Sequence, residues 1–94
     1  MMTIKSKYAD LEFACGLAED RVIRAEREAK SHLEQVEHMK VRLSKLQPDT
    51  KAYLDYESEY QDALDDQRNL ECYVDLIRKE RDRLRAELRR AINE

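Results

Sequence analysis

Apolar residues recur at alternating spacings of three and four along this chain, on both sides of its single proline, Pro48. This heptad spacing gathers the apolar side chains on one narrow face of an α-helix, the face through which helices pack in coiled coils. Proline lacks the N–H of a continuing helix and disfavours helical dihedrals at the preceding residue, Gln47. The sequence therefore predicts a first helix over about residues 3–46, a turn at 47–50 and a second helix over about residues 51–92. Asp49 or Thr50 is expected to cap the second helix, unless Pro48 occupies its first position.

We call the residues on this heptad face the seam. In the first helix it comprises Ile4, Tyr8, Leu11, Cys15, Ala18, Val22, Ala25, Ala29, His32, Val36, Met39, Leu43 and Leu46. In the second helix it comprises Tyr53, Tyr56, Tyr60, Ala63, Gln67, Leu70, Val74, Ile77, Arg81, Leu84, Leu88 and Ala91. Tyr8 and Tyr53 are heptad a positions, so the seam alternates between a and d. Its polar members are His32, Gln67 and Arg81.

An antiparallel hairpin aligns the two seams throughout when Val36 lies opposite Ala63. The same register places His32 opposite Gln67, where the two polar side chains can form a hydrogen bond with each other. We therefore treat the polar seam residues His32, Gln67 and Arg81 as a register-setting polar core. A polar layer usually stabilises less than an apolar one, so His32→Leu is expected to raise thermal stability.

Charged residues beside the seam agree with this register. The e positions pair Glu12 with Arg85, Glu19 with Arg78 and Lys40 with Glu57, with one clash between Glu26 and Glu71, and the g positions pair Arg21 with Glu80 and Arg42 with Glu59. Exposed pairs contribute only ~0.2–1 kcal/mol each, so they select the alignment more than they stabilise it. The predicted fold is an all-α, antiparallel two-helix coiled-coil hairpin that forms a single domain over residues 1–94.

Composition excludes several other classes of protein. Charged residues are 41% of the chain and hydrophobic residues another 41%, with one Gly, one Pro and no Trp, which is unsuited to a sandwich or a barrel. The net charge of -3 is too small to imply a partner. No apolar run is long enough for a membrane span, and the N-terminus does not read as a signal peptide. The two cysteines are then expected to be reduced thiols, and the protein is expected to be cytoplasmic.

Residue patterns for catalysis or metal binding are weak. His32 lies on the seam and His38 on the outer face, and Cys15 and Cys72 lie on different faces, so neither pair is expected to share a metal. The sequence has no Glu-x-x-His pair, Gly-rich phosphate loop or nucleophile elbow. We therefore expect no enzyme activity, no cofactor, no metal and no small-molecule substrate.

Apolar residues outside the seam predict a second contact surface. The set comprises Phe13, Leu17, Ile23, Tyr73 and Leu76. These residues fit the interface of a homodimer, in which two hairpins form a four-helix bundle, because one hairpin alone buries little core. The alternative is scattered surface apolar residues, which are normal. Gly16, beside Phe13 and Leu17, indicates either close approach by another helix or a tolerated glycine.

Two further segments carry candidate binding residues. Tyr53, Tyr56 and Tyr60 lie near the turn in an acidic segment, either as a partner-binding tip or as the tyrosine-packed end of the core. Residues 78–90 are basic, through Arg78, Lys79, Arg81, Arg83, Arg85, Arg89 and Arg90. These cations fit nucleic-acid phosphates, but several are already assigned to the seam or to cross-helix pairs, which favours a solvated helix face.

The function expected from these patterns is that of a non-catalytic coiled-coil protein–protein interaction module. Within that class, an adaptor, an assembly factor and a small inhibitor or regulator of the kind that phages encode are all compatible with the sequence. The alternative function, from a different class, is a nucleic-acid-associated protein that binds phosphates through residues 78–90.

Overall fold

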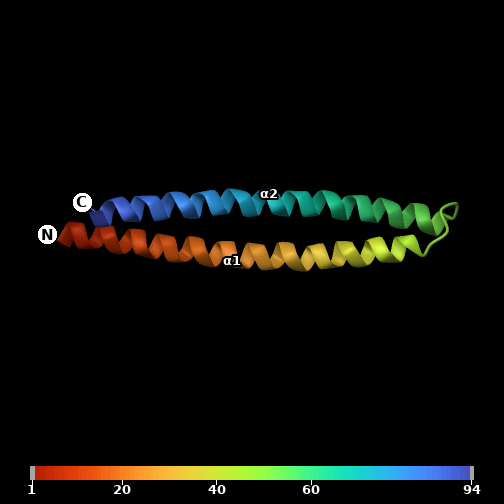
Figure 1. Ribbon diagram of the computed structural model, residues 1–94, viewed down its shortest axis with the longest axis horizontal. Coiled ribbons are helices and arrows are strands. Elements are labelled where there is room, and N and C mark those ends of the chain that lie inside the picture. Colours follow the sequence, from red (N-terminus) through yellow and green to blue (C-terminus); the bar gives the residue numbers. More distant parts are fainter. Residues whose placement is uncertain (1, 94) are drawn as a thin grey trace. The chain divides into compact units, whose positions relative to one another are not determined.

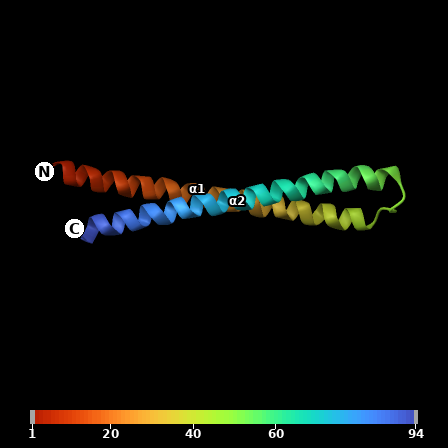
Figure 2. The ribbon, with the colours of Figure 1, turned by 90° about the horizontal axis from the view of Figure 1, so that it is seen from above.

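A computed structural model describes the backbone of residues 2–93 and the side-chain exposure of residues 8–93. The chain forms two helices of 43 residues each, α1 (Met2–Ser44) and α2 (Lys51–Asn93). The helices pack antiparallel as a hairpin (Figures 1 and 2), which confirms the predicted all-α hairpin fold.

Two compact units divide the chain, and each contains a piece of both helices. We call Met1–Glu26 with Tyr73–Glu94 the terminal unit, and Arg27–Cys72 the turn unit. In each unit the α1 and α2 segments run in opposite directions (Figure 1).

The turn between the helices is built from side-chain and backbone hydrogen bonds. Lys45 and Leu46 donate to carbonyls three residues back, both at 3.1 Å, so α1 tightens and ends at Ser44 rather than near residue 46. Thr50 caps α2, because its Oγ1 accepts the N–H of Tyr53 at 3.2 Å and donates to the carbonyl of Gln47 at 2.8 Å. Of the capping residues compatible with the sequence, the structure selects Thr50.

The core is the predicted seam. Every seam residue from Tyr8 to Ala91 is buried or half-buried, whereas the residues between them are mostly exposed. Ile4 lies outside the residues whose side chains are described. The most buried apolar members are Cys15, Ala18, Val22, Ala25, Ala29, Val36, Val74 and Ile77. Several of them are small, so the core is narrow as well as long.

The predicted register is observed in both units. In the turn unit His32 lies opposite Gln67, with 2.6 Å between the His32 Nδ1 and the Gln67 Oε1. In the terminal unit Arg21 pairs with Glu80 across the helices at 3.8 Å, as the g positions predict.

Cysteines at opposite seam positions test this register in solution. Val36 is buried and Ala63 half-buried, and the register places them in one layer. We expect Val36→Cys with Ala63→Cys, in a background of Cys15→Ala and Cys72→Ser, to form a disulfide within one chain. Non-reducing electrophoresis at low protein concentration is the measurement. Products that are all cross-linked between chains would instead indicate helices exchanged between two copies.

Candidate functional site

Large apolar side chains outside the seam remain exposed in both units. The exposed fraction is 69% for Phe13 and 65% for Leu76, against 2% for the seam residue Val22. The full set comprises Phe13, Leu17, Ile23, Leu33, Val41, Leu54, Tyr73, Leu76 and Ile92. So many exposed apolar side chains on two helices suggest an interaction surface.

The predicted dimer-interface residues all belong to the terminal unit, and all are exposed, but they do not share one face. In an antiparallel pair the e positions of both helices line one flank of the seam and the g positions line the other. By heptad position Leu17, Tyr73 and Leu76 lie toward the g flank and Ile23 toward the e flank. Phe13 occupies the f position, opposite the seam.

A charged pair interrupts the apolar residues of the g flank. Arg21 follows Leu17 by one helical turn, and its partner Glu80 follows Leu76 by one turn. Leu17 therefore does not form one continuous patch with Tyr73 and Leu76, as a single four-helix interface through all five predicted residues would require.

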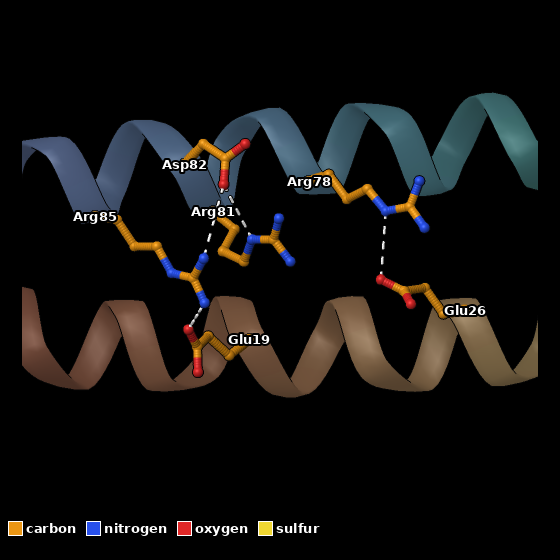
Figure 3. Close-up of polar contacts among 6 residues, drawn as sticks. All are labelled: Glu19, Glu26, Arg78, Arg81, Asp82 and Arg85. Carbon is orange, nitrogen blue, oxygen red and sulfur yellow. Dashed lines mark hydrogen bonds and ion pairs between the residues drawn. The ribbon is translucent and has the colours of Figure 1, made fainter.

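The e flank of the terminal unit carries ion pairs between the helices (Figure 3). Arg85 of α2 donates a hydrogen bond to Glu19 of α1, and Arg78 donates to Glu26 at 3.3 Å. The predicted e-position pairs place each of these arginines against the glutamate one heptad earlier in α1, which is Glu12 for Arg85 and Glu19 for Arg78. Those two predictions are wrong. The predicted clash is also replaced by attractive contacts, because Glu26 pairs with Arg78 and Glu71 accepts from Gln67.

The direction of the side chains explains the shift by one heptad. Helical side chains lean toward the N-terminus of their own helix. In antiparallel helices Glu19 and Arg85 therefore lean toward each other, as Figure 3 shows, whereas Glu19 and Arg78 would lean apart. A long side chain therefore contacts the partner toward which it leans, and not the residue whose position along the helix axes is nearest to its own.

One arginine of this flank has a shifted pKa. The hydrogen bond with Glu19 raises the pKa of the Arg85 guanidinium above its ordinary value. A raised pKa stabilises the fold at every pH below the ordinary value, and this contribution is lost only in strong alkali. Arg81, on the seam, turns to Asp82 of its own helix at 3.1 Å, with 22% of its side chain exposed. Its charged head thus has a partner, as a half-buried arginine on an apolar seam requires.

The basic segment is largely occupied by carboxylates. Arg78, Arg81, Arg83 and Arg85 each contact at least one acidic side chain, including Glu87 at 2.8 Å from Arg83. The other predicted phosphate-binding residues, Lys79, Arg89 and Arg90, are exposed on the same helix. A phosphate group would have to compete with these carboxylates for the arginines.

The polar layer of the turn unit is a connected network. Gln67 is 6% exposed, and its Nε2 donates to the Ala29 carbonyl and to Glu71, both at 3.2 Å. Its Oε1 must then be the acceptor that faces His32, which assigns the ring proton to Nδ1. An open crevice of about 380 Å³ adjoins this layer, lined by His32, Asp66, Asn69 and Leu70.

The tyrosine end of the turn unit is half-buried. Tyr53, Tyr56 and Tyr60 are all half-buried, and the Arg42 guanidinium lies 5.4 Å from the centre of the Tyr56 ring. Their role as a partner-binding tip stays a prediction.

Two further apolar side chains are exposed near the turn, Val41 at 53% and Leu54 at 60%. Neither was predicted as an interface residue. Their signal was present, because both are apolar residues that fall off the heptad seam.

Within the part of the chain that the structure describes, no group of three or more His, Cys, Asp or Glu side chains is arranged to hold a metal ion. Among the same residues, neither helix offers a stretch sufficiently long and apolar to cross a membrane. Comparisons with protein-family models, with curated proteins and with solved structures give no match for this sequence.

Proposed function

We propose that this chain is a non-catalytic protein–protein interaction module that acts in the cytoplasm as an adaptor, assembly factor or small inhibitor. The observation that carries this proposal is the exposure of large apolar residues outside a seam that is already filled, above all Phe13 and Leu76. Exposed apolar side chains cost solubility, and on helices they serve as anchors for a partner helix.

Self-association is part of the proposal. The seam contains several alanines, so the two helices bury little apolar surface for their length. A second hairpin would add a second set of helix–helix contacts and form a four-helix bundle. The chain would then work as a homodimer, and further partners would bind the surfaces that the dimer leaves exposed.

Sedimentation equilibrium of wild type and two charge-bearing variants tests the proposal. We expect the wild type to dimerise and Phe13→Glu with Leu17→Glu to be monomeric at the same concentration, because each carboxylate would be buried against apolar partners. Val41→Glu with Leu54→Glu is the matched control, since it places the same charges on exposed apolar residues of the turn unit.

The outcomes separate three situations. A dimer lost only in the control variant would move the interface to the turn unit. A wild type that stays monomeric at high concentration would rule out the homodimer and leave these residues for a different protein.

Phosphate binding by residues 78–90 is the competing function, and the ion pairs of these arginines disfavour it. A titration with duplex DNA at increasing salt distinguishes it from the interaction module. Micromolar affinity that falls steeply with salt would establish nucleic-acid binding instead.

A further inference from the structure

We infer that the outer face of α1 in the terminal unit, which carries an excess of acidic side chains, binds the basic outer face of α2 in a second copy of this chain. This contact rests on the proposed self-association and goes beyond it. Because the two faces are different, each copy carries both halves of the contact, and a pair of hairpins can accept further copies.

Charge is divided between the two helices of the terminal unit. From Tyr8 to Glu26, α1 carries five acidic side chains and two basic ones, whereas from Tyr73 to Asn93, α2 carries seven basic side chains and four acidic ones. Apart from Arg24, the exposed charges that make no ion pair with a described side chain are negative on α1 and positive on α2. They are Asp10, Glu12 and Asp20 on α1, and Lys79, Arg89 and Arg90 on α2. The outer faces of two copies are therefore complementary in charge.

Apolar side chains lie among these charges on both outer faces, at the spacing of a helix contact. The α1 stripe comprises Asp10, Phe13, Leu17, Asp20 and Arg24, and the α2 stripe comprises Leu76, Lys79, Arg83, Ala86 and Arg90. Both stripes step by three and four residues in turn, so each stays on one side of its helix. All of these residues are exposed, including Phe13 at 69% and Leu76 at 65%.

Antiparallel alignment of the two stripes pairs their unlike charges. Asp10 lies in one layer with Arg90 of the second copy, and Asp20 lies in one layer with Lys79. A shift by one heptad in either direction leaves at most one attractive pair between the stripes. A parallel alignment of the same stripes would bring Arg24 beside Arg90. Charge therefore selects both the direction and the register of the contact.

The layers between these ion pairs hold the apolar side chains of α1. Phe13, the most exposed large apolar residue, lies opposite Ala86, whose small side chain leaves room for the aromatic ring. Leu17 lies opposite Arg83, which contacts Glu87 of its own helix at 2.8 Å, so that its apolar stem can cover the leucine. Both large apolar residues of the α1 stripe are thus covered.

The two stripes face away from each other within one copy. Each lies at heptad positions c and f, on the side of its helix away from the seam. A contact between unlike faces that point apart does not close in a pair, and it leaves one face of each kind free. The proposed homodimer is then the first member of a series of oligomers.

Charge reversal with mixing tests the contact between unlike faces. We expect Asp10→Lys with Asp20→Lys, and separately Lys79→Glu with Arg90→Glu, each to weaken self-association about tenfold or more, because both ion pairs of the contact become repulsive. An equimolar mixture of the two variants should associate as tightly as wild type, because every contact between them again pairs unlike charges. Sedimentation equilibrium measures the association, and circular dichroism checks that helicity is unchanged.

Lys30→Glu with Lys51→Glu is the matched control for the α2 variant. It makes the same change of charge at exposed residues of the turn unit, so it should associate as wild type does.

Concentration dependence tests whether the contact is open-ended. We expect sedimentation velocity of wild type to show species larger than a dimer as the concentration rises, and the α1 variant alone to show none at the same concentrations. A wild-type mass that stops at the dimer would contradict a contact between faces that point apart.

Two further results would overturn the inference. They are an α2 variant that associates as tightly as wild type, and a mixture that fails to regain affinity. If Phe13→Glu with Leu17→Glu is still monomeric in either case, the proposed homodimer stands and only this geometry is wrong. A monomeric wild type removes both.

Discussion

Val22→Asp is expected to unfold the terminal unit, whereas Ile23→Asp, one residue later, should leave it folded. Val22 is 2% exposed and is the largest fully buried side chain, at the centre of the narrow seam. A carboxylate there has no partner, and an uncompensated buried charge costs roughly 3–5 kcal/mol. That is a large part of the roughly 5–15 kcal/mol by which domains are stable. The exposed fraction of Ile23 is 48%, so the same carboxylate remains in water.

Circular dichroism during thermal unfolding is the measurement for both variants. Val22→Asp should lose much of its helical signal at 25 °C or melt far below wild type, and Ile23→Asp should melt close to wild type. Equal melting of the two variants would mean that Val22 is not in a packed seam in solution.

The polar layer of the turn unit gives the second large effect, and it corrects the expectation for His32→Leu. From the sequence, the layer is expected to be an isolated pair of His32 and Gln67, and leucine at residue 32 is expected to stabilise the fold. In the structure His32 donates to the Oε1 of the buried Gln67, so His32→Leu leaves that acceptor unsatisfied, at a cost of about 1–3 kcal/mol. The single substitution is therefore expected to lower the melting temperature.

Removing both polar partners should reverse this loss. With Gln67→Leu added to His32→Leu, no orphaned group remains in the layer. Full burial of a leucine stabilises by roughly 1.5–3 kcal/mol, and the half-buried residue 32 contributes less than the buried residue 67. We expect the double variant to melt above wild type and the single variant to melt below it. Urea unfolding of wild type, His32→Leu, Gln67→Leu and the double variant gives the coupling between the two positions. Additive effects would show that the hydrogen bond between His32 and Gln67 contributes nothing.

Local patterns account for the parts of the fold that could be predicted. The seam follows from a spacing that can be read residue by residue, and the break at Pro48 follows from the missing N–H of proline. The layer of His32 and Gln67 follows once the two seams are aligned. These features depend on nearest neighbours along one helix or directly across two helices.

Features that depend on the direction of side chains in space could not be read in the same way. The pairing of Glu19 with Arg85 needs the lean of both side chains, which heptad letters do not contain. Gln67 also donates a hydrogen bond to the backbone carbonyl of Ala29, and the order of side-chain types does not show which backbone groups lie within reach. For the candidate site, apolar residues off the seam predict exposure well. Heptad letters also separate the flanks on which Leu17 and Ile23 lie, a distinction that matters for any interface.

The lean of charged side chains in antiparallel helices has a consequence for protein engineering. A designer who wishes to make two such hairpins mutually exclusive would recode charges at the positions nearest in level, such as Glu12 and Arg85. An exchange of those two charges would remove Arg85 from its contact with Glu19 and would place two carboxylates together there. Selectivity would instead be encoded by exchanging the charges of Glu19 with Arg85 and of Glu26 with Arg78. The charge pairs that make antiparallel hairpins selective are thus displaced by one heptad from the pairs that lie nearest to each other along the helix axes.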